Sequence, residues 1–218
     1  MSKTQSPLVI RVAEPEAAAA WMVDNLFFQP TQEPNTVVNG TCRMTFAAGG
    51  AAQCRPAPPG LYHTGPEHMA LRTADIQAAL AHCKQRKLPL NLNNGQVWFN
   101  PGVYGEGEYY FNFVTPFGLL VEISQRAAQP HYGESQIIQG LDHVGIPSED
   151  ITRRMACLSR QGFSQEFAPI QNYNDAEGRI FCCMMRRDDL ILEVYQFADM
   201  VPSGCAASGC LTLPGLEL

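Results

Sequence analysis

Two histidines and two glutamates recur in register along this chain, and together they could bind a divalent metal ion. His68 opens the segment His-Met-Ala-Leu-Arg-Thr-Ala-Asp-Ile, and His143 opens the similar segment His-Val-Gly-Ile-Pro-Ser-Glu-Asp-Ile. Glu122 and Glu193 each lie inside an apolar run, where burying a carboxylate is costly unless it is paired. The four side chains offer nitrogen and oxygen donors that suit Zn, Ni, Co, Mn or Fe, and the sequence does not distinguish among these metals.

The alternation of side chains along a strand places these four residues on one face of a sheet. Around Glu122 the residues at odd positions are apolar and would pack under a helix, so Glu122 faces the other way. Glu193 alternates in the same manner, and each histidine is followed two positions later by a small residue, Ala70 or Gly145. These small residues leave space above the shared face. We therefore expect a site of two histidines and two glutamates if the two segments pack about a pseudo-twofold axis.

A purely structural explanation competes with the metal site. A single histidine in a strand is usually a satisfied core residue, and gene duplication could carry such residues along as a relic of the fold. A third, weaker copy of the repeat at the start of the chain argues against this explanation. It has Pro7 in place of the histidine, and its last strand, Thr-Cys-Arg-Met-Thr-Phe, contains no glutamate. The copy that diverged has lost both residue types together, which favours a shared function.

The repeat also predicts the elements that position these residues. Each histidine strand is followed by apolar residues at helical spacing, with Thr73 and Ser148 as expected helix N-caps. Two further strands precede each glutamate strand, so the unit is one strand, one helix and three strands. The expected strands are 96–100 and 108–114 in the second copy, 164–169 and 179–185 in the third, and 36–38 and 41–47 in the first. The helix of the first copy is expected over 16–26, with Pro15 at its first position.

We therefore predict an α+β fold of three βαβββ modules, the first of them degenerate. Residues 1–60 form the degenerate module and a Pro/Gly/Ala linker, 61–130 the second module, 131–200 the third, and 201–218 a flexible tail. Cys205 and Cys210 lie in that tail, and a zinc or redox pair there lacks recognisable partners.

Composition excludes several classes of function. Fifteen Lys and Arg against 21 Asp and Glu give a net charge of −6, and no basic stripe suits nucleic acid or an anionic membrane. The start of the chain has no apolar signal region, and no window reaches about 18 apolar residues. The eight cysteines have no framework spacing, which is typical of reduced thiols in the cytoplasm. We expect a small-molecule substrate, with neither a nucleic-acid nor a membrane partner.

Three segments resemble the signatures of the vicinal oxygen chelate superfamily, the group of glyoxalase I, bleomycin-resistance proteins and extradiol dioxygenases. They are Glu67-His-Met-Ala-Leu-Arg-Thr-Ala-Asp-Ile, Phe113-Val-Thr-Pro-Phe-Gly-Leu-Leu-Val-Glu-Ile and Leu141-Asp-His-Val-Gly-Ile-Pro-Ser-Glu-Asp-Ile. The resemblance implies that paired modules curl into a cleft that holds a divalent metal. The implied ligands, in the order that resembles glyoxalase I, are His68, Glu122, His143 and Glu193.

The resemblance implies a metal-dependent lyase or isomerase that acts on a small oxygen-rich molecule. Glu122 or Glu193 would also move a proton beside a chelated carbonyl. Two alternatives stay open. His68, His143 and Glu193 alone match the ligand set of an Fe(II)-dependent extradiol dioxygenase, although the additional acid/base His and Tyr of those enzymes are not identifiable. The other alternative is a non-catalytic protein that binds a small molecule such as an antibiotic.

The family usually has an even number of modules, so the pairing of three modules is a separate question. The simplest arrangement pairs the second and third modules within one chain, and the first module then meets its counterpart in a homodimer. The rival arrangement pairs the first and second modules, and His143 and Glu193 from two chains share a site at the dimer axis. A separation of about 3–4 Å between the ring nitrogens of His68 and His143 within one chain fits the first arrangement, because metal–nitrogen bonds are about 2.0–2.1 Å.

Overall fold

The structure is a computed structural model that describes residues 8–49, 60–90, 94–128, 136–174, 178–206 and 211–218. The first segment, residues 8–49, corresponds to the degenerate copy of the repeat. It contains β1 (Leu8–Val12), α1 (Pro15–Leu26), β2 (Gln29–Pro30), β3 (Thr36–Asn39) and β4 (Cys42–Ala48). Helix α1 begins at Pro15, as predicted, because the fixed φ of proline suits the first helical position and its missing N–H costs nothing there. Pro7, the residue in place of a histidine, lies outside the described residues.

The second segment (residues 61–126) and the third segment (residues 141–197) each place a helix after the histidine strand and then further strands, three in the second and four in the third. The second contains β5 (Leu61–Thr64), β6 (His68–Arg72), α2 (Ile76–Gln85), β7 (Trp98–Asn100), β8 (Glu108–Val114) and β9 (Leu120–Arg126). The third contains β10 (Leu141–Pro147), α3 (Ile151–Arg160), β11 (Ser164–Gln165), β12 (Ile170–Asn174), β13 (Gly178–Arg187) and β14 (Leu190–Phe197). The predicted strand 164–169 is wrong beyond Gln165. Pro169 has no N–H to give to a ladder, and the chain forms β12 directly after it.

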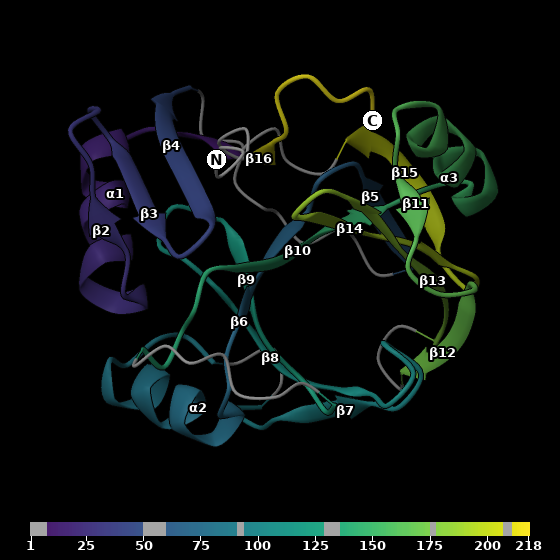
Figure 1. Cartoon of the computed structure of the whole chain (residues 1–218), viewed down its shortest axis with the longest axis horizontal. Coiled ribbons are helices and arrows are strands. Elements are labelled where there is room, and N and C mark those ends of the chain that lie inside the picture. Colours follow the sequence, from purple (N-terminus) through teal and green to yellow (C-terminus); the bar gives the residue numbers. More distant parts are fainter. Residues whose placement is uncertain (1–7, 50–59, 91–93, 129–135, 175–177, 207–210) are drawn as a thin grey trace.

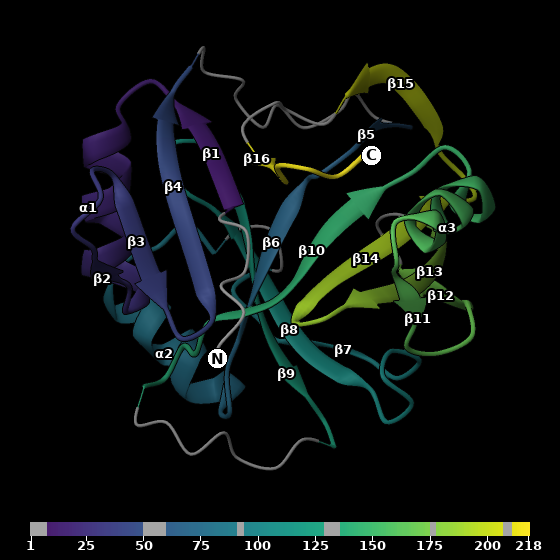
Figure 2. The same cartoon turned by 45° about the horizontal axis from the view of Figure 1, so that its top comes forward.

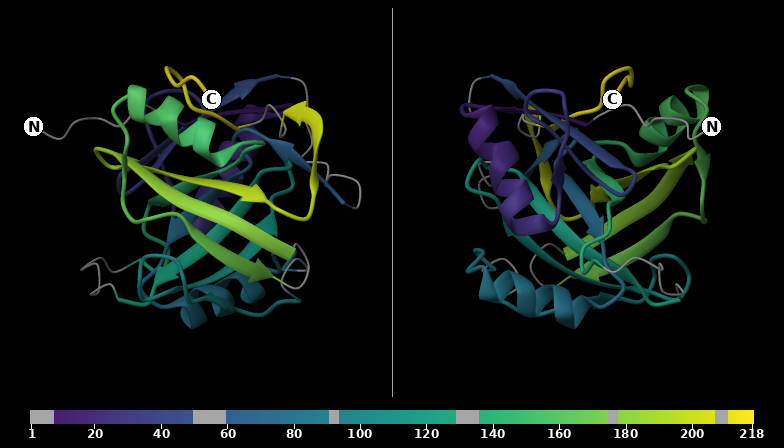
Figure 3. Two further views of the ribbon diagram at one scale, coloured as in Figure 1. Left: turned by 90° about the vertical axis from the view of Figure 1, so that its right-hand side faces the viewer. Right: turned by 60° about the vertical axis from the view of Figure 1, so that its left-hand side comes forward.

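The second and third segments form a single curled sheet. Its nine strands follow the order β11-β13-β14-β10-β6-β9-β8-β7, with β12 paired to β13, and the antiparallel pair β6–β10 joins the two halves at the middle. Figure 1 shows this sheet curling round on itself, and Figure 3 shows α2 and α3 on opposite outer sides of it. The predicted α+β class and the curled, paired sheets are confirmed.

A smaller sheet belongs to the first segment. It has the order β16-β1-β4-β3-β2, where β16 (Leu211–Thr212) comes from the end of the chain and lies antiparallel to β1 (Figure 2). A second late strand, β15 (Val201–Ala206), pairs with β5. The described part of the tail, for which flexibility was expected, thus contains two strands, and Leu211 and Leu213 are buried in the main core.

The helix caps differ from the prediction in an informative way. The side chains of Asp75 and Asp150, rather than Thr73 and Ser148, accept free backbone N–H groups in the first turns of α2 and α3. Thr73 instead closes a short turn, in which its hydroxyl accepts the N–H of Asp75 at 3.2 Å. In α2 a threonine two residues before the aspartate thus makes the turn, and the aspartate makes the helix cap.

One apolar core runs between α1, the small sheet and the outer face of the curled sheet. The ring of Trp21 on α1 lies 6.5 Å from that of Phe113 on β8 and 5.7 Å from that of Phe117. The first segment therefore packs against the outer face of the second. Among the described residues, no helix has the length and apolar character that crossing a membrane requires.

Candidate metal site

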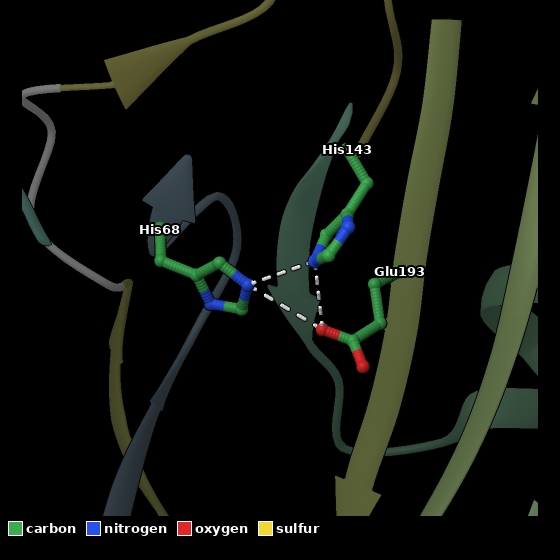
Figure 4. Close-up of side chains that lie close together, drawn as sticks. All are labelled: His68, His143 and Glu193. Carbon is green, nitrogen blue, oxygen red and sulfur yellow. Dashed lines mark hydrogen bonds and ion pairs between the residues drawn. The ribbon is translucent and has the colours of Figure 1, made fainter. Parts of the chain in front are cut away.

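His68, His143 and Glu193 point at one another from three adjacent strands, β6, β10 and β14 (Figure 4). The Nε2 atoms of the two histidines are 3.4 Å apart. Glu193 Oε2 lies 3.4 Å from Nε2 of His68 and 3.5 Å from Nε2 of His143. The separation of the ring nitrogens agrees with pairing of the second and third segments within one chain. It disagrees with the rival arrangement, in which His143 and Glu193 of two chains share a site at a dimer axis.

Glu122 approaches the same centre from β9. Its Oε1 atom lies 3.5 Å from Nε2 of His143. Glu122 also belongs to an overlapping group with Glu108 and His143, whose ligand atoms lie within 4.8 Å of one another. All four predicted residues are thus brought together, but Glu193 lies between both histidines and Glu122 lies beside His143.

The strand register explains how these side chains share one centre. One row across the sheet is Glu122, Ala70 and His143, and the next is His68, Gly145 and Glu193. Each row therefore places a small residue between two polar ones. A Cβ on Gly145 would lie 1.9 Å from Cε1 of His68, so the ring occupies the space that a side chain at position 145 would need.

Each of the four side chains has a partner for its outward atom. Nδ1 of His143 lies 3.2 Å from Oδ1 of Asp142, and Nδ1 of His68 lies 3.5 Å from the hydroxyl of Tyr195. The thiol of Cys182 donates to Oε1 of Glu193 at 3.3 Å. The atoms left facing inward are the two Nε2 atoms and one oxygen of Glu193.

Glu122, the fourth side chain, also has a partner for the oxygen that faces away from the centre. In the amide orientation that satisfies both of its polar atoms, the nitrogen of Asn112 donates to Oε2 of Glu122 at 3.2 Å, which leaves Oε1 facing His143. Asn112 lies opposite Glu122 on β8. Partners of this kind fix the orientation of metal ligands in known sites. The donor set, its convergence and its outer contacts fit one divalent cation.

The two glutamates of the site differ in the direction of their pKa shifts. Burial alone would raise the pKa of Glu193, but hydrogen bonds from His143 and His68 hold it well below its usual range. Burial raises the pKa of Glu122 to about 7, although the two histidines lower it. Burial lowers the histidine pKa values, yet the neighbouring carboxylates outweigh it and raise that of His68 to about 10. The carboxylates thus favour positive charge at this centre, and a divalent cation would supply it.

Several site residues were not predicted. Glu108 is buried, accepts a hydrogen bond from Ser124, and has its pKa raised to about 8, chiefly by burial. Asp142 and Glu67 each precede a site histidine, and this acidic residue before each histidine is a signal present in the repeat. Cys205 and Cys210, for which the sequence offered no recognisable partners, lie outside the part of the chain whose side chains the structure describes.

Comparison with known proteins agrees with this fold. The Glyoxalase/Bleomycin resistance protein/Dioxygenase superfamily model matches residues 4–123, which is more than half of the chain. No curated protein sequence matches the chain. The structure of glyoxalase I from Zea mays is similar with a TM-score of 0.59 and 16% identity, over 92% of this chain and 69% of that chain.

Two further solved structures share the fold. A protein of Bacillus subtilis subsp. subtilis str. 168, described as a dioxygenase, has a TM-score of 0.54 and 15% identity, over 97% of this chain and 69% of its own. A mutant of 4-hydroxymandelate synthase from Streptomyces coelicolor has a TM-score of 0.50 and 11% identity, over 88% and 70%. At these identities the similarity is one of fold, and the chemistry must be argued from the site.

Proposed function

Because the chain belongs to the glyoxalase/bleomycin resistance protein/dioxygenase superfamily, we propose that it is a divalent-metal-dependent lyase or isomerase of glyoxalase type. The substrate in this proposal is a small oxygen-rich molecule with a carbonyl beside an acidic C–H group. The observation that carries the proposal is the convergence of four donor atoms, from three buried side chains and the partly buried Glu193, each of which has its other polar atom held from outside.

The proposed roles follow from the position of each side chain. His68, His143 and Glu193 hold the metal, because Glu193 Oε2 lies within 3.5 Å of both imidazole nitrogens. Glu122 acts as the base, since it touches only one of the histidines and burial raises its pKa to about 7, near the value suited to proton transfer at neutral pH.

A bound divalent ion would supply Lewis-acid polarisation of the substrate carbonyl. Glu122 would take the proton from the adjacent carbon and return it to the neighbouring carbon. The electron pair of the broken C–H bond moves into the carbon–oxygen system and back, so the step requires no oxidant. The contact between Oε2 of Glu122 and Asn112 would orient the carboxylate during both transfers.

The first experiment measures metal in the purified protein by mass spectrometry. We expect one divalent ion per chain, and a large fall in occupancy for His68→Ala and for Glu193→Ala, because either leaves an under-coordinated, charged site. His63→Ala is the matched control, since His63 bonds Ser203 and lies outside the cluster. Full occupancy and unchanged affinity in both site variants would contradict the proposed centre.

A second experiment separates binding from proton transfer. Dihydroxyacetone, a simple hydroxyketone, is incubated with the loaded protein in D2O, and deuterium entry at carbon is followed by NMR. Glu122→Gln should retain most of its metal but lose the exchange. If Glu122→Gln instead exchanges as fast as the unsubstituted protein, Glu122 is not the base.

One observation favours a second candidate, an Fe(II)-dependent dioxygenase. His68, His143 and Glu193 form a compact group by themselves, and two histidines with one carboxylate is the ligand set of many non-haem Fe(II) oxygenases. Consumption of O2 with a catechol by the Fe(II)-loaded protein, with both oxygen atoms appearing in a ring-opened product, would support this candidate over the first.

We also propose a location for the protein. Free thiols such as those of Cys83 and Cys182 suit a reducing compartment, so we propose that the protein works in the cytoplasm.

A further inference from the structure

We propose that Asp142 is a positioning residue for His143, and that Tyr104 and Arg126 hold Asp142 in place for this role. The inference deepens the proposed function and rests on it for its purpose, because it concerns how one metal-facing imidazole is fixed. Its geometric content, the orientation of the His143 ring, is testable whether or not metal binds.

The contact between the two residues defines the role. Oδ1 of Asp142 lies 3.2 Å from Nδ1 of His143, and the carboxylate is only 2% exposed. When Nδ1 donates its proton to the carboxylate, the lone pair of a neutral His143 is on Nε2. Nε2 is the atom that faces His68, Glu122 and Glu193. The hydrogen bond therefore selects both the rotation of the ring and the nitrogen that can bind a metal.

Several hydrogen bonds hold the carboxylate of Asp142 in place. Nη2 of Arg126 donates to its Oδ1 at 3.0 Å and Nε donates to its Oδ2 at 3.3 Å. The hydroxyl of Tyr104 donates to the same Oδ1 at 2.9 Å. The guanidinium carbon of Arg126 also lies 3.6 Å from the centre of the Tyr104 ring. The carboxylate thus has a neutral partner in Tyr104 and a charged one in Arg126, and Nε of Arg72 also lies 4.0 Å from its Oδ2.

The loop that carries Tyr104 adopts a backbone that needs outside support. Tyr104 has a φ of 54°, a left-handed value that is unfavourable for a residue with a bulky side chain. Next to it, Val103 is fully buried against Met184 and Ile191, which come from β13 and β14. The loop between β7 and β8 therefore reaches across to the third segment. Strain held in this way by surrounding contacts is a mark of functional positions.

The pseudo-equivalent contact at His68 is looser. Glu67 precedes His68 as Asp142 precedes His143, but its Oε2 is 3.9 Å from Nδ1 of His68 and its side chain is 30% exposed. Glu67 accepts a hydrogen bond from Tyr195. The two halves of the site are therefore unequal: the His143 ring is fixed by a buried ion pair, while the His68 ring is bordered by a half-exposed carboxylate.

The experiment compares Asp142→Asn and Tyr104→Phe with Tyr109→Phe, a control whose exposed ring lies on the outer face of β8. Zn²⁺ affinity is measured by competition with a chromophoric chelator. In Asp142→Asn, the amide cannot satisfy all the donors around it, because one of its ends must face a donor of Arg126. We expect a loss of about 10–100-fold in Zn²⁺ affinity. Tyr104→Phe removes one neutral hydrogen bond, and we expect a loss of about 2–10-fold.

The readout that a merely structural role would not move is the protonation pattern of His143. Long-range ¹H–¹⁵N NMR spectra of metal-free and Zn²⁺-loaded protein assign the ring nitrogens. We expect a slowly exchanging proton on Nδ1 of His143 in the unsubstituted protein and faster exchange of that proton in Asp142→Asn, with Tyr109→Phe unchanged. Wild-type affinity together with an unchanged exchange rate of that proton in Asp142→Asn would overturn the inference.

The two proposals fail in different ways. If the unsubstituted protein binds no Zn²⁺ but its His143 keeps a slowly exchanging Nδ1 proton that Asp142→Asn abolishes, the positioning stands and the metal function does not. If Zn²⁺ binds and Asp142→Asn alters neither property, only the positioning is overturned. Should Asp142→Asn fail to fold, Tyr104→Phe decides the matter through its own shift in Zn²⁺ affinity and in the exchange rate of the Nδ1 proton, and no shift in either would overturn the positioning.

Discussion

The His68 ring lies against Gly145, its neighbour across strands β6 and β10. We expect Gly145→Ala to lower the free energy of unfolding by about 1–3 kcal/mol, because the new methyl group would overlap the ring. In a His68→Ala background the same change should cost close to nothing, since the ring is gone. Urea unfolding of the four proteins checks this; an equal cost in both backgrounds would mean that the clash is with another group.

A surface pair gives a prediction about pH. Asp199 accepts hydrogen bonds from the backbone N–H of Arg179 at 2.9 Å and from its guanidinium at 2.7 Å, and these lower the pKa of Asp199 to about 2. A depressed pKa contributes stability above the unfolded value, and that contribution is lost as the pH falls through about 2. NMR titration of Asp199 should show this value, and Arg179→Gln should move it towards 3.8. A titration that Arg179→Gln leaves unchanged would contradict the assigned cause.

At the scale of single residues, the sequence predicts the candidate metal ligands better than it predicts the residues that hold those ligands in place. His68, Glu122, His143 and Glu193 are recognisable because each has a counterpart in a second copy of the repeat. Tyr104 and Arg126 have no such counterpart, and they reach Asp142 only after the two halves of the sheet have packed together. A contact between modules that are far apart along the chain leaves no pattern in either module alone.

At the scale of elements, the two capping aspartates differ in what they satisfy. Oδ1 of Asp75 accepts two backbone N–H groups, from Gln77 and Ala78, whereas Asp150 accepts one, from Arg153. We expect Asp75→Ala and Asp150→Ala to lower the free energy of unfolding by about 0.5–2 kcal/mol each, with the larger effect at Asp75.

Chemical denaturation of the two cap variants measures these costs. Asp24→Ala, a change at an exposed position within α1, is the matched control and should have little effect. A smaller cost at Asp75 than at Asp150 would mean that the number of accepted N–H groups does not set the strength of the cap.

The elements also share a repeated glutamine that was not predicted. The side-chain oxygen of Gln125 accepts the N–H of Ile76, and that of Gln196 accepts the N–H of Ile151. Each glutamine follows a site glutamate by three positions, so the signature extends from Glu to Gln in both copies. The polar tail of the strand thus fixes the start of the helix that packs on it. The helices and most strands were predictable from periodicity, but bonds between a strand end and a helix start were not.

At the scale of the whole molecule, the late segment 211–218 contributes to the core. Leu211 is 2% exposed and packs in the same cluster as β1 and β4. We expect Leu211→Ala to lower the free energy of unfolding by about 2–5 kcal/mol, as for other buried leucines. Val201→Ala, at a position that is 61% exposed on β15, is the control and should change little. Equal midpoints for both variants in thermal unfolding would show that β16 does not stabilise the fold.

The expected homodimer through the first module stays a prediction, as does the division of the chain at residues 60, 130 and 200. The face of the small sheet turned away from its buried side includes Val9, Val38 and Thr45, all partly exposed. If this face forms the dimer, light scattering should give twice 24.0 kDa for the protein and 24.0 kDa for Val38→Glu. A charge at Val201 is the control. A monomeric unsubstituted protein would contradict the prediction.

The pairing of β16 with β1 has a consequence for how the protein is made. Thr212 and Val9, which are joined across these strands, are separated by 203 residues, so β1 leaves the ribosome long before its neighbour exists. At about 5–20 residues per second, the wait lasts about 10–40 s. During that time the nascent chain presents an open strand edge, the feature that most readily recruits other chains. Slower translation of the last third of the message should therefore increase aggregation during synthesis, even though the finished protein is unchanged.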